Sequence, residues 1–209
     1  MTNSYYYNGI ASAARTHLTT SVANGGFGWY ISDKGGVNPV SFNDTTDGNW
    51  NSGSTWGNAG SVEGTDYPGL FNPVTIDSNT VTLSANQSSG DTTISGAGTL
   101  DLAGNQLSVA GNWNNTGAFN ANSGTISLNG YNQSISGDST FYNLIKSTTA
   151  TDTLTFAASS TQSIAPSGTL TLSGIAGHLL LLRSSLSPNV WNLNLDSSAN
   201  KTKTGACVE

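Results

Sequence analysis

Hydrophobic residues recur in short alternating pairs through the middle of the chain. Leu107/Val109 and Ile126/Leu128 each place two apolar side chains on one face of an extended segment. Gly, Asn and Ser lie between such pairs, and these residues accept the tight or left-handed backbone of a turn. A period of two over spans this short indicates strands, since a helix needs apolar residues three and four positions apart. The pattern therefore predicts an all-β protein of short strands.

The alternating segments continue from Val74 to Leu195 at uneven spacing. A glycine-threonine step followed by two alternating apolar residues recurs at Gly98, Gly124 and Gly168. Short strands in an imperfect repeat predict a parallel β-helix, or β-solenoid, wound around a narrow core. A β-sandwich remains the alternative, because it also gives short strands with turn signals every ~8–12 residues.

The ends of the chain lack this alternation. Residues 1–46 are expected to form an irregular N-terminal arm or anchor segment, and residues 47–196 the β-solenoid domain. Residues 197–209 have no apolar pattern and are expected to be a C-terminal tail or an exposed final strand. The sequence thus predicts one β domain between two extensions.

Aromatic residues gather before the first regular strands. Trp50 and Trp56 flank a Gly/Ser turn, where they are expected to cap the open first layer of the β domain. The arm holds further aromatic side chains, and such residues bury much area at low entropic cost in contacts between proteins. Packing against the domain's own end is an equal alternative for the tyrosine run. The candidate assembly contacts in the arm are Tyr5, Tyr6, Tyr7, Phe27, Trp29 and Tyr30.

The charge and hydropathy of the chain argue against two classes of partner, nucleic acids and the membrane interior. The 209 residues hold only six Lys plus Arg against twelve Asp plus Glu, without a basic cluster. We therefore expect no nucleic-acid partner, because phosphate binding needs clustered positive charge. No stretch approaches the ~20 apolar residues of a membrane span, so membrane insertion is not expected. Met1 opens the chain without a secretory signal pattern, which favours either a domain cut from a longer protein or a virion protein.

Carboxylates are the first candidates for chemistry, since polysaccharide hydrolysis needs two of them in one groove. No two acids of the strand region are separated by a single residue, the spacing that would put them on one face of one strand. Most lie beside Gly, Ser, Thr or Asn, where an Asp side chain commonly closes a turn. These acids are Asp77, Asp91, Asp101, Asp138, Asp152 and Asp196.

Metal and nucleophile motifs are also weak. Only His17 and His178 could supply imidazole, and Cys207 is the single cysteine, so a disulfide within the chain is excluded. Asp44 and Asp47 lie in an acidic loop that lacks the spacing and the closing glutamate of a calcium loop. We therefore predict no catalytic, cofactor-binding or metal-binding residue, and a protein that is not an enzyme.

Several segments carry a resemblance to a known family. Residues 98–144 combine GNW (Gly111–Trp113), a GT-apolar step (Gly124–Ile126) and the final FYNL (Phe141–Leu144). Together with GNWNSGSTWG (Gly48–Gly57) and the leucine-rich segment 178–195, they are similar to right-handed parallel β-helix structural proteins of bacterial surfaces and phage virions. The resemblance covers about residues 47–196 and implies a right-handed parallel β-helix.

The same resemblance implies a structural function. The first expectation is a virion surface component of a bacteriophage, a capsid decoration (cement) or fibre-type protein that stabilises or decorates an assembly through its N-terminal arm. The implied partners are copies of itself, with a trimer as one expected form, and a virion scaffold. The alternatives are a domain of an extracellular bacterial adhesin or stalk at the cell surface, and a polysaccharide-active β-helix enzyme.

Overall fold

The computed structural model describes residues 6–7, 36–37 and 39–208, and it divides the chain into two compact units, Met1–Val40 and Ser41–Glu209. In the first unit two short strands, β1 (Tyr6–Tyr7) and β2 (Gly36–Val37), pair in parallel. The division after Val40 differs from the expected boundary after residue 46, because Phe42 already pairs with the sheet of the second unit. All that follows concerns the second unit unless stated.

The second unit is all-β, as the sequence predicted, apart from one described 3₁₀ turn, η2 (Gly53–Trp56). Its strands form three sheets, and each of the paired strands within them is parallel to its neighbours. This pairing differs from the β-sandwich alternative, in which hairpins would pair consecutive strands antiparallel.

The largest sheet has eight strands, and each contributes two to five residues. Their order in the sheet follows their order in the chain. They are β3 (Phe42–Asn43), β5 (Val74–Ile76), β8 (Thr92–Ile94), β11 (Trp113–Asn115), β14 (Gln133–Gly137), β16 (Asp152–Phe156), β18 (Leu180–Ser184) and β21 (Ala206–Val208).

The other two sheets interleave with the first along the chain. The seven-stranded sheet holds β7 (Gln87–Ser89), β10 (Gln106–Val109), β13 (Thr125–Leu128), β15 (Ser139–Ser147), β17 (Thr161–Ser173), β19 (Asn192–Leu195) and β20 (Asn200–Thr204). The four-stranded sheet holds β4 (Gly48–Asn49), β6 (Thr80–Thr82), β9 (Thr99–Asp101) and β12 (Ala118–Asn120).

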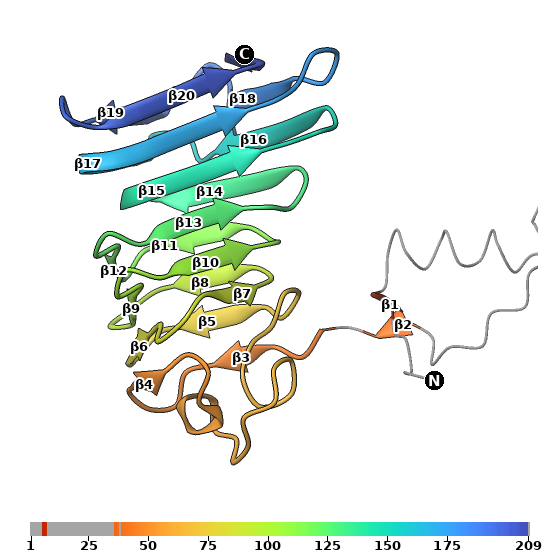
Figure 1. Cartoon of the computed structure of the whole chain (residues 1–209), viewed down its shortest axis with the longest axis vertical. Helices are drawn as coiled ribbons and strands as arrows, with labels where there is room; N and C mark the ends of the chain where they lie inside the picture. The colour runs from red at the N-terminus through yellow and green to blue at the C-terminus, as the bar shows by residue number, and fades with distance from the viewer. Residues whose placement is uncertain (1–5, 8–35, 38, 209) are drawn as a thin grey trace, which may run out of the picture. The chain divides into compact units, whose positions relative to one another are not determined.

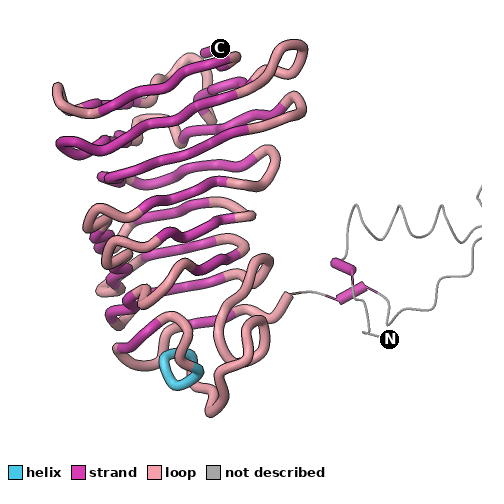
Figure 2. Tube along the Cα trace, in the orientation of Figure 1, coloured by secondary structure: helices cyan, strands magenta, loops and turns pink. Residues whose placement is uncertain are grey.

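The strands are stacked in layers along the unit, and loops join one sheet to the next, the longest of them between β4 and β5 (Figures 1 and 2). Residues in equivalent positions of successive layers pair directly, as in the register Leu107↔Ile126, Ile126↔Leu144 and Leu144↔Leu170. Apart from β19 and β20, which both pair with β17, consecutive strands of this unit lie in different sheets, and strands roughly one layer apart in sequence lie side by side.

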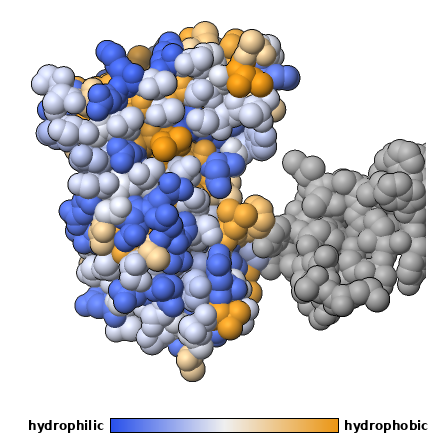
Figure 3. Space-filling model, viewed as in Figure 1, coloured by the Kyte–Doolittle hydropathy of each residue, from blue (hydrophilic) through white to orange (hydrophobic). Residues whose placement is uncertain are grey.

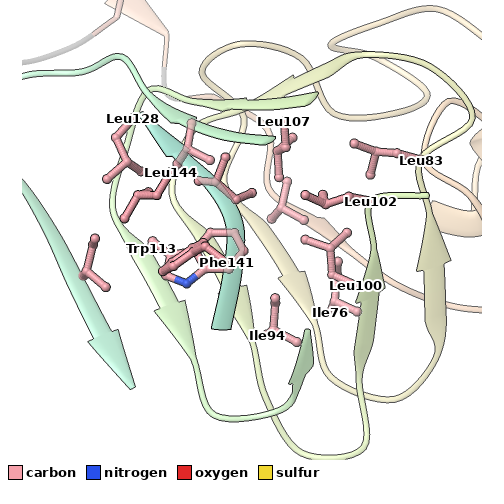
Figure 4. Close-up of a cluster of buried hydrophobic side chains, with 14 of the residues drawn as sticks. Ile76, Leu83, Ile94, Leu100, Leu102, Leu107, Trp113, Leu128, Phe141 and Leu144 are labelled. Atoms are coloured by element: carbon pink, nitrogen blue, oxygen red, sulfur yellow. The ribbon is translucent and has the colours of Figure 1, made fainter. Parts of the chain in front are cut away.

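The interior is a continuous column of apolar side chains (Figure 4). The alternating pairs singled out in the sequence, such as Leu107/Val109 and Ile126/Leu128, point inward and are at most 1% exposed. Trp113 and Phe141 pack against each other in the middle of the column, with ring centroids 5.8 Å apart. Period-two alternation therefore identified the inward face of these strands correctly.

Glycines at the corners let successive layers approach closely. A Cβ on Gly98 would collide with the carbonyl of Ile76 in the layer before it, and one on Gly168 would collide with the carbonyl of Tyr142. Both glycines belong to the recurring glycine-threonine steps. The step therefore marks places where backbone passes against backbone, which only glycine permits.

The C-terminal segment, expected to be a tail or an exposed final strand, supplies strands of the final layer. β20 pairs with the second half of β17, and β21 pairs with β18. Backbone hydrogen bonds can hold a strand without apolar side chains, and β20 carries lysines where the previous layer carries leucines. An apolar pattern is not needed to continue the sheet.

Candidate assembly surfaces

The stack has two different ends. We call the end with β3, β4 and residues 51–72 the N-terminal end, and the end with β19, β20 and β21 the C-terminal end (Figure 1). Catalytic chemistry was not expected from the sequence, so these two surfaces are the candidates for function.

Two tryptophans and Phe42 close the N-terminal end. The ring centroids of Trp50 and Trp56 lie 5.3 Å apart in an edge-to-face arrangement, and those of Phe42 and Trp56 lie 6.0 Å apart. Nε1 of Trp50 donates a hydrogen bond to the Pro68 carbonyl (3.3 Å), and Nε1 of Trp56 donates to the Trp50 carbonyl (2.7 Å). Both indoles are buried with their polar atoms satisfied, as a covered layer requires.

A buried carboxylate ties the first layer to the second. Asp44 accepts hydrogen bonds from the backbone N–H groups of Asp77 (2.8 Å), Ser78 (3.2 Å) and Asn79 (2.6 Å), and from Nδ2 of Asn79 (2.8 Å). Burial raises the pKa of Asp44, but these bonds to the ionised form outweigh it and hold the pKa below its ordinary value. Asp44 is therefore a structural group whose carboxylate oxygens are already engaged by the backbone.

The segment that covers the tryptophans carries exposed apolar and acidic side chains. Val62, Leu70 and Phe71 are exposed on the segment that covers the tryptophans. Glu63 and Asp66 lie on the same segment, and Asp66 also accepts a hydrogen bond from the Val62 N–H (2.9 Å). This segment therefore presents apolar side chains among negative charges.

The C-terminal end has no such cover among the described residues. The register places six residues of its last layer at the inward positions that leucine, isoleucine or glutamine occupy one layer earlier. Four of the six are apolar and two are cationic. They are Leu193, Leu195, Lys201, Lys203, Ala206 and Val208.

A hollow of about 380 Å³ opens at this end. Its wall combines the apolar floor of the previous layer, from Leu170 and Leu172, with Leu195 and with Lys201 and Lys203 of the last layer. A second hollow of about 700 Å³ adjoins it across Trp191, whose ring stacks on Phe156 with centroids 3.8 Å apart. Figure 3 shows hydrophobic residues lying among polar ones at this end.

Charge is unevenly distributed between the ends. From Ser41 to Leu102 the chain holds acids but no Lys or Arg: Asp44, Asp47, Glu63, Asp66, Asp77, Asp91 and Asp101. Within the second unit, the exposed lysines and arginines are Arg183, Lys201 and Lys203, all near the C-terminal end. Among the described residues of the last layer, Asp196 is the acid. The described unit is therefore acidic at one end and basic at the other.

The one buried lysine of this unit lies in the middle of the stack. Lys146 pairs with Leu128 on one side and Leu172 on the other, so it occupies an inward position. Its Nζ lies 2.7 Å from Oδ2 of Asp152, and both side chains have no exposed area. Nζ also donates to Oε1 of Gln133 (2.8 Å) and to the Gly130 carbonyl. Burial lowers the pKa of Lys146, and the Asp152 carboxylate acts in the opposite direction.

Several carboxylates of the strand region accept hydrogen bonds from backbone N–H groups. Oδ1 of Asp91 accepts from the Asn112 N–H (2.6 Å), and Oδ1 of Asp138 accepts from the Thr161 N–H (2.8 Å), each in the following layer. Asp101 and Asp196 accept from N–H groups two residues on. Asp101 and Asp196 therefore show the expected turn role. Asp91 and Asp138 instead join successive layers, and Asp152 pairs with the buried Lys146.

Metal ligands do not gather in the part of the chain that the structure describes: three or more His, Cys, Asp or Glu side chains nowhere come together there. Cys207 is a free, exposed thiol, and His178 is exposed in a loop closed by a bridge to Ile175. The described residues also include no helix with the length and apolar character that a membrane crossing requires.

The aromatic arm can be placed only in part. Tyr6 and Tyr7 form β1, whereas Tyr5, Phe27, Trp29 and Tyr30 lie outside the described residues. The arm's role in assembly stays a prediction.

Sequence reasoning missed the residues of the C-terminal end. The segment NKTKT (Asn200–Thr204) carries an alternation like that of the earlier strands, with lysine in place of the apolar residue. That alternation was the available signal for Lys201 and Lys203. Apolar periodicity alone does not detect this strand, because its repeating inward residue is lysine.

Comparison of the chain with known protein families, curated proteins and solved structures finds no match.

Proposed function

We propose that the chain is a non-enzymatic structural protein whose second unit is a right-handed parallel β-solenoid. The observation that carries the proposal is the parallel pairing of inward positions from layer to layer, seen in Leu107, Ile126, Leu144 and Leu170. Right-handed coiling is the hand that nearly all parallel crossover connections take.

The polar side chains support a structural role. Asn112 accepts from the Ser134 N–H (2.8 Å), and Asn105 donates to the Leu83 carbonyl (2.8 Å), each across one layer. Such bonds consume polar groups that a binding or catalytic groove would display, and they stiffen the stack along its axis. Rigidity is what a stalk, fibre or capsid decoration requires.

The proposed setting is a bacteriophage virion surface, with the protein acting as a decoration or fibre-type component held by its N-terminal arm. This setting rests on the resemblance described above. The covered N-terminal end, with Trp50 and Trp56 as its cap, is compatible with a stack that begins at the arm.

Light scattering on the purified full chain over a range of concentrations tests the proposal, together with an assay for release of reducing ends from polysaccharides. Self-association without polysaccharide cleavage supports a structural protein. Cleavage of any polysaccharide would overturn it and favour the β-helix enzyme. A monomer that binds glycans without cleaving them would favour the surface adhesin instead.

A further inference from the structure

We propose that copies of the chain associate head to tail, with the C-terminal end of one second unit against the N-terminal end of another. This inference rests on the proposed structural function and adds to it a particular pair of surfaces. The occupant of the C-terminal end is thus a second copy of this chain.

The C-terminal end has the form of a surface that is completed by a partner. β19, β20 and β21 each pair with one neighbouring strand among the described residues, so their other edges present backbone groups for hydrogen bonding. Val208 is 60% exposed, although Val109 and Leu128 in the interior have at most 1% exposure. The apolar floor of Leu170 and Leu172 lines an open hollow.

The N-terminal end offers the complementary chemistry. Val62 and Leu70 supply exposed apolar area, and Glu63 and Asp66 supply negative charge on the same segment. Lys201 and Lys203 supply the positive charge at the other end. Contact between unlike ends brings apolar area together and opposite charges near each other, and such complementarity fixes orientation.

Charge also argues against the symmetric alternatives. Two C-terminal ends would bring four lysines together, and two N-terminal ends would bring together acids without a basic partner. A contact between different patches does not close on itself unless the rotation forms a ring, so it leads to open chains of copies. The expected assembly is therefore a filament rather than a dimer.

Sedimentation velocity on the full chain is the test, at about 20 mM and about 500 mM salt, since screening acts most strongly on exposed charges. The average mass should rise with concentration above the monomer's 21.4 kDa at low salt, and it should fall at high salt. The variant K201E/K203E should remain monomeric at concentrations where the unmodified chain associates.

A reciprocal variant makes the test specific. S61K/E63K reverses charge on the exposed N-terminal segment and should also remain monomeric alone. A mixture of the two variants should associate again, because each then presents ends opposite in charge to those of the other. The control T149E/T151E adds two glutamates to exposed positions between β15 and β16 and should associate like the unmodified chain. Circular dichroism checks that all variants are folded.

The outcomes separate this inference from the proposed function. A closed oligomer whose mass is the same in K201E/K203E would overturn head-to-tail contact and leave the structural function standing. A monomer at every concentration, or a mixture that fails to recover association, would also overturn it. Polysaccharide cleavage would overturn the structural function, whereas recovery in the mixture would still establish the contact between ends.

Discussion

The two ends of the strand stack solve the same physical problem in different ways. The first and last layers of any such stack expose apolar core and unpaired strand edges to water. At the N-terminal end the chain folds back and buries Trp50 completely. At the C-terminal end none of the described residues covers the last layer, and two of its inward positions hold Lys201 and Lys203. One end is covered within the described part of the chain, and the other is the end that we propose a second copy completes.

Inward lysines suit an open end. An inward-pointing charge keeps a layer soluble and discourages indiscriminate pairing with other strand edges. The same charge becomes favourable when an acidic partner arrives. The buried tryptophans cover the N-terminal end whether or not a partner is present. The proposed cover of the C-terminal end, in contrast, depends on binding a second copy.

The largest expected effect tests the closed end. Trp50→Ala should lower the free energy of unfolding by about 3–5 kcal/mol, because it removes a large buried side chain and leaves a cavity. Trp56 would lose its edge-to-face partner as well. Urea unfolding followed by circular dichroism measures the change.

The matched control is Trp191→Ala at the open end. Trp191 is only partly buried and stacks on Phe156 at one face. Its loss should cost about 1–2 kcal/mol, from the stacking contact and partial burial. Equal effects at the two tryptophans would contradict the difference between the ends.

The second prediction compares two lysines in one inward column. Lys146→Met should destabilise the chain by about 3 kcal/mol or more, because it leaves the Asp152 carboxylate buried without its ion-pair partner. Lys203→Met, in the same column at the open end, should change the free energy of unfolding by no more than about 0.5 kcal/mol. Chemical unfolding of both variants decides it.

The double variant K146M/D152N shows whether the charge is the cause. The amide introduced by D152N would keep an oxygen for the N–H groups of Asn132 and Thr153 while removing the unpaired charge. The double variant should therefore be more stable than K146M alone. A double variant less stable than K146M would show that the packing of Met, and not the lost ion pair, is responsible.

These residues also show what the sequence can and cannot predict. Apolar alternation at Leu107/Val109 and Ile126/Leu128 predicted strands with a buried face, because local backbone periodicity determines which side chains share a face. Trp50 and Trp56 were found as a pair before the first strands, and they do lie in contact. Local pattern therefore revealed strand faces and two tryptophans that lie in contact, whose role as a cap stays a prediction.

Features that depend on the pairing register between layers could not be predicted from the local pattern. Lys146 reads as a surface residue in the sequence, and only pairing between layers shows that it lies inside with Asp152. The layers differ in length, since β15 spans nine residues and β17 spans thirteen, and so no fixed period aligns them. The basic C-terminal end was missed for the same reason, because its lysines become inward only through pairing with Leu170 and Leu172.

The third prediction concerns the tie between the first two layers. Asp44→Asn should cost about 1–2 kcal/mol near neutral pH, through the loss of charge-assisted bonds to the backbone. The folded state holds the pKa of Asp44 below the ordinary value of 3.8. The carboxylate's contribution is therefore present above that value and lost as pH falls through the lower, folded-state value.

Unfolding measured from pH 7 down to pH 2 tests this dependence. The stability difference between D44N and the unmodified chain should shrink as the pH falls, because protonation removes the same charge from Asp44. Asp196→Asn is the control at the open end. The carboxylate of Asp196 is exposed. The hydrogen bonds from Ser198 that lower its pKa lie within a single turn and join no two layers. A difference for D44N that stays constant with pH would show that the carboxylate's charge does not hold the first layers together.

The smallest expected effect examines the open end itself. Val208→Ser should change the unfolding free energy of the dilute chain by no more than about 0.5 kcal/mol, because the side chain is already largely in water. The same substitution at Val81, which is buried in the second layer beneath the tryptophans, should cost several times more. The measurement must be made at low concentration, since association would stabilise the unmodified chain by mass action. As the concentration rises, Val208→Ser should become destabilising relative to the unmodified chain, whereas the effect of Val81→Ser should be present throughout. An effect of Val208→Ser that is large in dilute solution would mean that this end is already covered within one chain, and the contrast between the two ends would fail.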